Sequence, residues 1–487
     1  MKSELLGQGL SRAHRSAHPM KRSPLLLLGV LLMCALSTGL ARGEARPAAG
    51  PLRVSKENHR YFAAPSGKIV YFAGAHTWPN LRDMGHSDPP KPFDWPGYLD
   101  FLTERHHNFI RLWSWDLSRH VDASGEAIYT SPFPWPRTGP ETALDGKPKF
   151  DLSRFEQSYF DRLRDRVKSA GQRGIYVSIM LFEGWGVQRV REAWAGHPFN
   201  LANNNNGVDG DPDRTDKGLA VNTLQVPAVT RVQEAYVRRV IDAVSDLDNV
   251  LYEIANEAGP YSTEWQYHMI RFVKQYEAGN PKQHPVGMTF QFRGGRNQAL
   301  FDSPADWISP NPQASGGYSY RENPPPADGR KVILSDTDHL WGIGGSQAWV
   351  WKSFCRGMNP LFMDPYLHDT FYTRPMPGLD PKWHPVRDSL GHTRQFAERM
   401  DLAKATPSEE IASSGYCLAV PGKEYLVYLP EGGSVTVDLS AASGQMAVEW
   451  FDPSRAETHP AGMASGGAEV TFRAPFIGDA VLYLERR

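Results

Sequence analysis

The chain has 487 residues, with 53 Lys and Arg against 54 Asp and Glu and a formal net charge of −1. This length exceeds one ordinary hydrophobic core, so we expect a large domain and a smaller one. The balanced charge gives no basic surface for a nucleic acid, so we expect no nucleic-acid partner.

Residues 1–41 have the pattern of an export signal. Basic residues up to Arg22 precede an apolar run over 25–36, and small residues follow as far as Ala41. The run is short for a membrane span, which needs about 20 residues. We therefore expect a secreted or periplasmic protein with no stable membrane insertion after signal cleavage; an uncleaved anchor is the alternative.

From about residue 52 to 400, short apolar runs alternate with longer charged stretches, which is typical of strands alternating with helices. The stretches 155–171 and 226–244 carry apolar residues on one face and are predicted helices. Eight apolar runs are predicted strands, the number that closes a (β/α)₈ TIM barrel. These runs are 69–75, 108–113, 175–182, 250–255, 285–290, 307–309, 332–335 and 360–363.

After about residue 403 the pattern changes to short alternating segments such as EYLVYLP, SVTVDLS and AVLYLERR, separated by Gly, Pro and Ser. This is typical of a small all-β sandwich domain. The predicted organisation is therefore a signal peptide at 1–41, an α/β TIM-barrel catalytic domain at 42–402 and a β-sandwich at 403–487. Cys355 and Cys417 follow the signal segment, and they are compatible with one bridge or with two buried thiols.

The segment NVLYEIANEAG ends the fourth predicted strand with Asn256 and Glu257. A carboxylate at the C-terminal end of a barrel strand faces the mouth, where barrel enzymes carry their active sites. Hydrolysis of a glycosidic bond needs an acid to protonate the leaving oxygen and a second carboxylate across the sugar. We predict Glu257 as general acid/base and Asn256 as a donor to the neighbouring sugar hydroxyl, with Glu253 as a deeper structural group.

The segment RKVILSDTDHLWG ends the seventh predicted strand and supplies the second carboxylate. Asp336 is the first acidic residue after the apolar run, and Asp338 follows two residues later. We predict Asp336 as the nucleophile, because the strand would have to extend further to present Asp338 in the same way. The other aspartate would hold the nucleophile's hydrogen-bond network or a sugar hydroxyl.

Carboxylates on strands four and seven are the mark of clan A glycoside hydrolases, and the sequence resembles this clan over almost the whole mature chain. NFIRLWSWD resembles the clan's Asn-x-x-Arg element, which implies that Arg111 lies beside the nucleophile and keeps it ionised. FAGAHTWPNL and FDLSRFEQSYFDRL resemble the apiosidase-like branch. VDLS, EWFDP and FIGDAVLYL resemble the collagen-binding-type β-sandwich that often follows such barrels.

The resemblance implies a retaining glycosidase that acts on a poly- or oligosaccharide. One departure from the clan is chemical: its usual nucleophile is Glu, whereas both candidates here are Asp. Retention needs about 5 to 5.5 Å between the two carboxyl groups. A side chain shorter by one methylene either widens that gap or is compensated by the position of the strand.

Other residues at strand ends are candidates for substrate contact, and each has an alternative role in structural hydrogen bonding or core packing. They are His76, Trp78, Trp113, Trp115, Glu183, Gln291, His339 and Trp341.

The sequence has no G-x-S-x-G, no H-E-x-x-H and no glycine-rich nucleotide signature, so we expect neither a cofactor nor a metal. The polar loop 203–216 contains acidic residues, but their spacing matches no EF-hand. The alternatives to an enzyme are a non-catalytic polysaccharide-binding protein and a surface adhesion protein that acts through its sandwich. Two opposed carboxylates favour the enzyme, and the fold leaves the sugar open.

Overall fold

The computed structural model describes residues 46–366, 370–371, 374–375 and 380–486. The predicted signal segment 1–41 lies outside these residues. Within them, no helix is both long and apolar enough to cross a lipid bilayer.

Eight parallel strands form the centre of the chain, in the neighbour order β4-β16-β15-β14-β13-β12-β11-β6. The backbone N–H of Asn108 donates to the carbonyl of Ala73 at 2.9 Å and joins the two outer strands, so the sheet closes. This confirms the predicted TIM-barrel fold class. The strands are β4 (Gly74–His76), β6 (Phe109–Leu112), β11 (Tyr176–Glu183), β12 (Val250–Asn256), β13 (Val286–Thr289), β14 (Trp307–Ser309), β15 (Val332–Asp336) and β16 (Asn359–Met363).

The predicted first strand over 69–75 is wrong, because two short strands stand in its place. β3 (Ile69–Val70) pairs with β2 (Phe62–Ala63), which pairs with β1 (Arg53–Val54) in a separate antiparallel sheet. Between β3 and β4, the N–H of Phe72 donates to Asn359 Oδ1 at 2.9 Å and that of Ala73 to Asn108 Oδ1 at 3.0 Å. Between β3 and β4, hydrogen bonds to side-chain amides therefore take the place of backbone hydrogen bonds to a neighbouring strand.

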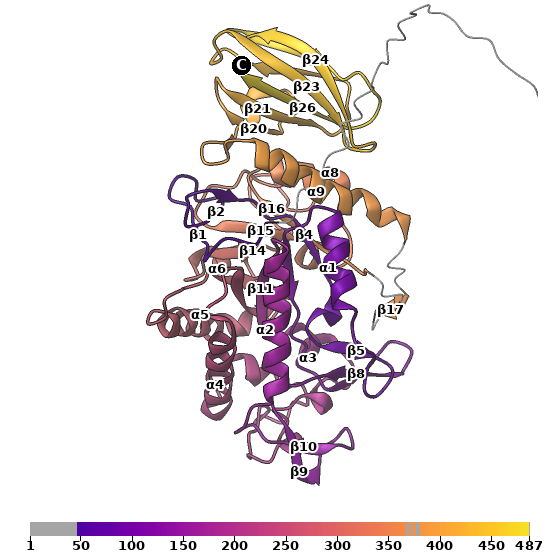
Figure 1. The fold of residues 1–487 in the computed structure, drawn as a ribbon. Helices are drawn as coiled ribbons and strands as arrows, with labels where there is room; N and C mark the ends of the chain where they lie inside the picture. The colour runs from indigo at the N-terminus through magenta and orange to yellow at the C-terminus, as the bar shows by residue number, and fades with distance from the viewer. Residues whose placement is uncertain (1–45, 367–369, 372–373, 376–379, 487) are drawn as a thin grey trace, which may run out of the picture. The chain divides into compact units, whose positions relative to one another are not determined.

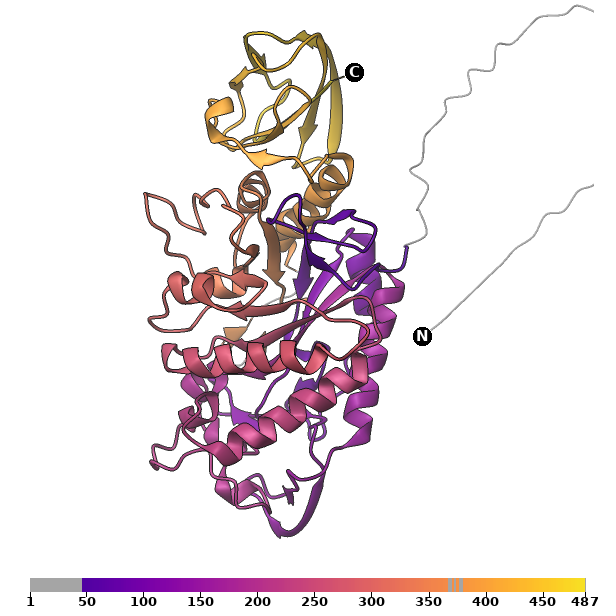
Figure 2. The same cartoon turned by 90° about the vertical axis from the view of Figure 1, so that its left-hand side faces the viewer.

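Amphipathic helices cover the outside of the barrel, and Figures 1 and 2 show α2, α4 and α5 there. In α2 the apolar residues Tyr159, Leu163, Val167 and Ala170 recur at helical spacing and are buried. The predicted helices at 155–171 and 226–244 are confirmed. The helices are α1 (Trp95–Glu104), α2 (Gln157–Gln172), α3 (Trp185–Arg189), α4 (Pro227–Val244), α5 (Thr263–Glu277), α6 (Asn297–Asp302), α7 (Thr337–Leu340), α8 (Gln347–Cys355) and α9 (His384–Arg399).

Short elements sit in the connections after the barrel strands. β5 (Asp83–Gly85), β8 (Ala127–Ser131) and β7 (Arg119–Val121) form one antiparallel sheet, and β9 (Arg137–Thr142) pairs with β10 (Pro148–Phe150). β17 (Thr370–Phe371) pairs with β18 (Arg374–Pro375). The 3₁₀ turns in these connections are η1 (Trp78–Asn80), η2 (Trp194–Gly196), η3 (Leu201–Asn203), η4 (Leu219–Asn222), η5 (Pro260–Ser262) and η6 (Pro381–Trp383), whereas η7 (Glu409–Ile411) lies in the C-terminal part of the chain.

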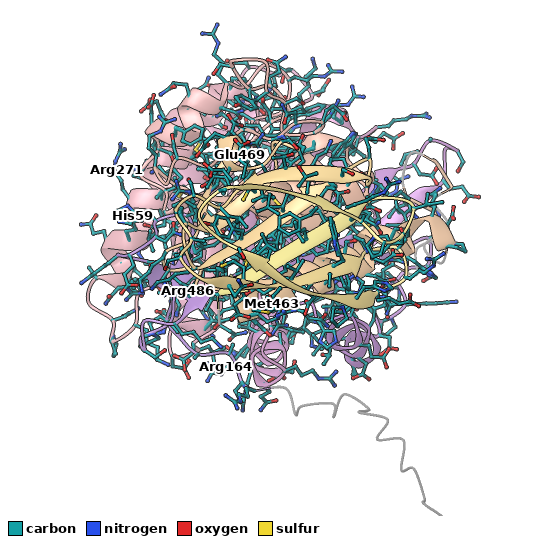
Figure 3. All side chains as sticks on the ribbon, turned by 90° about the horizontal axis from the view of Figure 1, so that it is seen from above. His59, Arg164, Arg271, Met463, Glu469 and Arg486 are labelled. Atoms are coloured by element: carbon teal, nitrogen blue, oxygen red, sulfur yellow. The ribbon has the colours of Figure 1, made fainter. Side chains whose placement is uncertain are left out.

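The C-terminal part is an antiparallel β-sandwich, as predicted. One sheet has the order β19-β20-β21-β26-β23-β24, and β22 pairs with β25 in the other. Met463 of β24 and Glu469 of β25 mark its surface in Figure 3. The strands are β19 (Thr406–Pro407), β20 (Cys417–Val420), β21 (Glu424–Leu429), β22 (Ser434–Asp438), β23 (Gln445–Asp452), β24 (Glu457–Ser465), β25 (Glu469–Arg473) and β26 (Ala480–Arg486).

The larger sheet of the sandwich has two buried faces. One packs on α8 and α9, where the ring centroids of Trp351 and Tyr428 lie 6.2 Å apart. Cys417 and Val427 belong instead to the core between the two sheets. Cys355 belongs to the cluster on the barrel side, so the two cysteines are free, buried thiols and form no bridge.

Candidate active site

A cavity of about 430 Å³ opens at the C-terminal ends of the barrel strands, within the size range of small-molecule sites. Three carboxyl groups reach it, from Glu183, Glu257 and Asp338. Its walls are otherwise rich in aromatic rings, which stack on the apolar faces of ligands. These rings belong to Trp113, Trp115, Trp185, Phe290, Phe292 and Trp341.

Glu257 follows directly after the last residue of β12, with a backbone φ of +48°. This left-handed conformation is uncommon outside glycine and turns the chain sharply at the strand end. Its carboxyl group has no hydrogen-bond partner among the described residues, and burial raises its pKa well above the usual value. The nearby charges of Asp338 and Glu183 raise this pKa further. Glu257 is therefore set up to keep its proton at neutral pH.

Asp338 lies in the first turn of α7, on the cavity wall. Its Oδ2 accepts from Nη1 of Arg111 at 2.9 Å. Burial raises the pKa of Asp338 to about 6, against the lowering effect of Arg111 and with a further rise from Asp336. At neutral pH this carboxyl group is the ionised partner of a protonated Glu257.

Asp336, the last residue of β15, is fully buried and lies outside the cavity lining. Its carboxylate accepts from His76 Nε2 at 3.0 and 2.9 Å, from Arg111 Nη1 at 3.1 Å and from the N–H of Asp338 at 3.0 Å. Burial alone would raise its pKa, but His76 and Arg111 hold it well below the usual range. Asp336 is thus an ionised group that caps α7 and has its oxygens occupied by the protein.

Arg111, from β6, is the buried cation that joins these acids. It donates from Nε and Nη2 to the two carboxylate oxygens of Glu253 at 2.8 and 2.6 Å. Nη2 also donates to Asn256 Oδ1 at 2.6 Å, and Nη1 donates to Oδ2 of Asp336 and Oδ2 of Asp338. A planar guanidinium can serve several acceptors in fixed directions, so Arg111 sets the relative positions of groups from β12 and β15.

A hydrogen-bond chain orients the amide of Asn256 on the cavity wall. Burial lowers the pKa of His339 well below its usual value, so the ring is neutral. Its Nε2 lies 3.3 Å from Asn256 Oδ1 and its Nδ1 lies 2.6 Å from Ser309 Oγ. Because the amide oxygen already accepts from Arg111, Nε2 is the protonated nitrogen and Ser309 donates to Nδ1. This leaves the Asn256 amide nitrogen directed toward Glu183.

Glu183 is the third acid of the cavity, at the end of β11. Its two oxygens accept from the N–H groups of Trp185 and Gly186, both at 2.8 Å. Burial raises its pKa to about 8, and the nearby Asp116 adds to the rise. Burial also raises the pKa of Asp116 to about 6. Glu183 therefore accepts hydrogen bonds from the first turn of α3, and it is a second buried acid near Glu257.

The structure separates the predicted site residues into two groups. Eight line the cavity, namely Trp113, Trp115, Glu183, Asn256, Glu257, Asp338, His339 and Trp341. Five lie outside this lining, namely His76, Trp78, Arg111, Gln291 and Asp336. Gln291 donates to Thr263 Oγ1 at 2.9 Å, and His76 bonds Asp336, so both side chains have hydrogen-bond partners within the protein, and substrate contact by them stays a prediction.

Several cavity residues were not predicted from the sequence. Trp185 follows β11, and Phe290 and Phe292 follow β13, where aromatic residues directly after a strand were a usable signal. Arg321 comes from the long connection after β14, far from any strand end. Nothing in its local sequence distinguishes it from other surface arginines.

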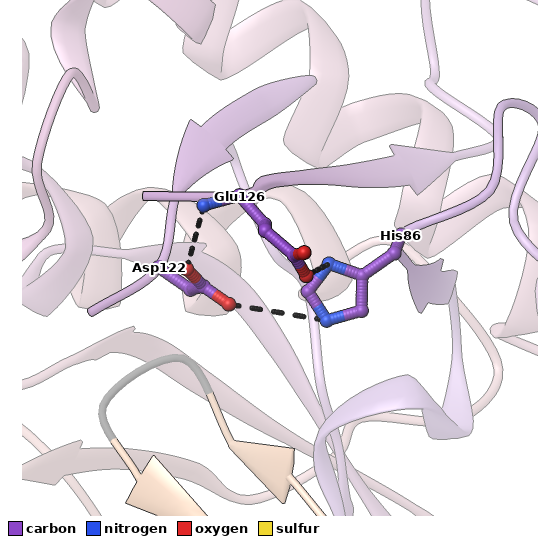
Figure 4. Close-up of side chains that lie close together, drawn as sticks. All are labelled: His86, Asp122 and Glu126. Carbon is purple, nitrogen blue, oxygen red and sulfur yellow. Dashed lines mark hydrogen bonds and ion pairs between the residues drawn. The ribbon is translucent and has the colours of Figure 1, made fainter. Parts of the chain in front are cut away.

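One group of side chains outside the cavity has the residue types of a metal site. Ligand atoms of His86, Asp122 and Glu126 lie within 4.8 Å of one another, on the sheet of β5, β7 and β8 (Figure 4). Asp122 Oδ1 already accepts from Ser124 and from the N–H of Glu126, and His86 and Glu126 are exposed. These contacts explain the cluster as a tight turn with surface ion pairs.

Comparison with known proteins shows similarity to two domain families. Residues 119–292 match a family described as a domain of unknown function, DUF6298. Residues 407–485 match the "Putative collagen-binding domain of a collagenase". No curated protein matches the sequence.

Solved structures share the fold over most of the chain. A structure named glycoside hydrolase is 14% identical, with a TM-score of 0.58 over 90% of this chain and 97% of its own. A glycoside hydrolase family 5 protein from Bacteroides vulgatus is 14% identical, with a TM-score of 0.59 over 90% of this chain and 93% of its own. Another structure from that organism, titled a putative glycoside hydrolase, is 13% identical, with a TM-score of 0.61 over 91% of this chain and 83% of its own. At these identities the likeness shows the fold alone.

Proposed function

We propose that the chain is a glycoside hydrolase that cleaves O-glycosidic bonds of a poly- or oligosaccharide. The observation that carries this proposal is the pair Glu257 and Asp338, which face one aromatic-lined cavity from β12 and from the helix after β15. Glu257 forms no ion pair with any of the described residues and its pKa is raised by burial, whereas Asp338 is bonded to Arg111. Two carboxyl groups with opposite protonation states are what glycoside hydrolysis requires.

The proposed reaction is a double displacement with retention. Asp338 attacks the anomeric carbon while Glu257 gives its proton to the leaving oxygen, which produces a glycosyl ester on Asp338 and a free alcohol. Glu257, now ionised, takes a proton from water as that water attacks the same carbon. The ester bond breaks, Asp338 leaves as a carboxylate and Glu257 regains its proton.

We propose Asp338 as the nucleophile, although the sequence pattern favoured Asp336. Attack needs an oxygen that can reach the sugar. All the hydrogen bonds on Asp336 come from within the protein, and its side chain has no exposed surface. Asp338 faces the cavity and uses one oxygen for Arg111. Asp336 then acts as the group that orients Arg111 and the first turn of α7.

The remaining cavity residues fit substrate binding. Asn256 can donate to the hydroxyl next to the reacting carbon, because its oxygen is held by Arg111 and His339. Trp113 and Trp341 offer rings on which sugar faces stack.

We also propose membership of clan A and of its apiosidase-like branch, and export of the mature chain to a secreted or periplasmic location. The barrel fold shared with proteins named glycoside hydrolase supports the first of these proposals. The residue pattern of 1–41 supports the second.

The test uses the purified mature chain on a panel of aryl glycosides and complex polysaccharides, with product anomers followed by NMR. We expect release of sugar with retained configuration, and a rate lower by about 10²- to 10⁴-fold in Glu257→Gln and Asp338→Asn. Glu264→Gln, an exposed carboxyl group on α5, is the matched control. A folded wild type that is inert on every glycan would contradict the proposal and favour a non-catalytic polysaccharide-binding protein.

A further inference from the structure

An arginine without an acidic partner stands on the wall of the cavity. Arg321 is half-buried, and its Nε donates to the carbonyl of Leu340. Its guanidinium carbon lies 5.8 Å from the ring centroid of Trp341, so the two side chains form adjacent parts of the wall. Among the described residues no Asp or Glu forms an ion pair with Arg321. The backbone bond fixes the guanidinium and leaves its terminal N–H groups for another acceptor.

Two further arginines stand beside the same cavity. The guanidinium carbons of Arg189 and Arg293 lie 5.9 and 5.8 Å from the ring centroid of Phe292, which lines the cavity. Arg189 ends α3, and Arg293 follows β13 with a φ of +59°. Both side chains are exposed, and neither forms an ion pair within the described part of the chain.

Acidic side chains therefore lie at the base of the cavity, and arginine side chains lie at its edge. Of the three acids in the cavity, Asp338 is bonded to Arg111, whose N–H groups also donate to Glu253, Asp336 and Asn256. Arg321, Arg189 and Arg293 form no ion pair in the part of the chain that the structure describes, although the chain as a whole has a formal net charge of only −1. Unneutralised cations at the edge of a cleft raise the local concentration of anions. A half-buried guanidinium also costs free energy unless an acceptor completes its hydrogen bonds.

We propose that these three arginines, here called the arginine rim, bind a negatively charged group of the glycan. The substrate class is then an acidic glycan, whose charge is the carboxylate of a uronic acid or a sulfate ester. The planar fork of Arg321 suits two parallel hydrogen bonds to either group. A sugar ring that stacks on Trp341 has its substituents beside Arg321. A sugar ring that stacks on Phe292 has its substituents beside Arg189 and Arg293. Cleavage of such a glycan rests on the proposed function, whereas its binding does not.

The test measures binding by the full mature chain carrying Glu257→Gln, by titration calorimetry. The probes are trigalacturonate, a sulfated galactose oligosaccharide and neutral galactotriose. We expect one or both acidic probes to bind at least about tenfold more tightly than the neutral one, and this preference to weaken as salt rises. The acidic probe that binds more tightly identifies the carboxylate or the sulfate as the source of the charge.

Arg321→Gln added to the same chain should reduce the preference for the acidic probe by about tenfold. Arg321→Lys keeps the charge but loses the fork, and it should restore part of the preference. Arg271→Gln is the matched control, because Arg271 is an exposed arginine on α5 that also lies over a ring, 5.8 Å from that of Tyr267. Figure 3 shows it at the outer edge of the molecule. Thermal melts of each variant check that the fold is retained.

Equal affinity for neutral and acidic probes, no binding of either acidic probe, or an unchanged preference in Arg321→Gln overturns the inference. Its failure is distinguishable from failure of the proposed function. If the wild type hydrolyses neutral glycans and shows no preference for acidic ones, the proposed function stands and the inference about the arginine rim is wrong. If the wild type binds the acidic probes but hydrolyses no glycan, the inference about the arginine rim stands and the proposed function is wrong.

Discussion

The side-chain amide of Gln347 donates to both carboxylate oxygens of Asp479, at 2.9 Å each. Asp479 belongs to the sandwich, where it also accepts from the hydroxyl of Tyr428 at 2.9 Å. Gln347 begins α8 and follows the loop whose residues Trp341 and Ile343 line the cavity. The sandwich thus holds the end of a loop that forms part of the candidate active site.

Breaking this link should destabilise the chain. Gln347→Ala and Asp479→Ala should each lower the free energy of unfolding by about 1 kcal/mol, because a half-buried hydrogen bond is lost. A double-mutant cycle in urea should give a coupling energy of about 0.5 to 1.5 kcal/mol. The i,i+4 surface pair Arg394 and Glu398 on α9 is the control, with an expected coupling below about 0.5 kcal/mol. Independent effects of the two alanine changes would contradict the link.

The rate should depend on pH through Asp338 and Glu257. Asp338 must be ionised to attack, so activity should fall as pH drops below about 6, the value to which burial raises its pKa. Glu257 must be protonated, and its raised pKa moves the alkaline fall well above the usual range for a glutamate. The measurement is kcat/KM against pH, and the two limbs belong to the coupled pair of acids. An optimum below pH 5 would be inconsistent with these assignments.

The two aspartates should differ in their response to substitution. Asp338→Ala should lose activity by about 10³-fold or more and regain part of it with azide, which attacks the anomeric carbon in place of the missing carboxylate. Asp336→Ala should reduce activity through the position of Arg111, and azide should give no recovery. The readouts are initial rates on an aryl glycoside and the anomer of the glycosyl azide formed. Azide rescue of an Asp336→Ala variant and not of Asp338→Ala would reverse the assignment.

Arg111→Met should be strongly destabilising. The change leaves Glu253, Asp336 and Asp338 buried without their shared cation, and breaking a buried pair in this way costs about 3 to 5 kcal/mol. Urea unfolding followed by circular dichroism measures the loss. Arg164→Met removes an exposed ion pair with Asp246 and should change stability by less than about 1 kcal/mol. Similar losses in the two variants would show that the buried cluster is not held by Arg111.

Neither cysteine should react with a thiol reagent in the folded chain. Burial raises the pKa of Cys355 to about 12, and that of Cys417 well above its usual value, so the reactive thiolate is absent and the sulfur is covered. Ellman's reagent should label both thiols in about 6 M guanidinium and neither without it. A chain that yields no thiol after unfolding would instead contain a bridge.

Much of the fold could be predicted because its signals are local. The apolar runs that became β11 and β12 follow the charged helical stretches that became α2 and α4, and this alternation is visible in a short window of the sequence. The position of Glu257 followed from the rule that strand ends face the barrel mouth. The division between β3 and β4 could not be predicted, because the amides that interrupt the strand belong to Asn108 and Asn359, far along the chain.

Which of Asp336 and Asp338 faces the cavity depended on a local conformation that spacing alone does not reveal. If β15 had continued, both aspartates would have faced the same side. Instead Asp336 caps α7, which turns Asp338 into the cavity and leaves Asp336 behind it with His76. The domain limits at 41 and 402 stay predictions.

By itself, the sequence determined a TIM barrel followed by a β-sandwich, and the strand ends on which acidic groups meet. Periodicity and composition carry that information, because they decide which face of each element is buried. Only the tertiary structure decided which carboxyl groups face the cavity, that Arg111 joins β12 to β15, and that Arg321 reaches the cavity from a distant loop. These outcomes depend on contacts between residues far apart in the chain, and the charge state of each acid follows from those contacts.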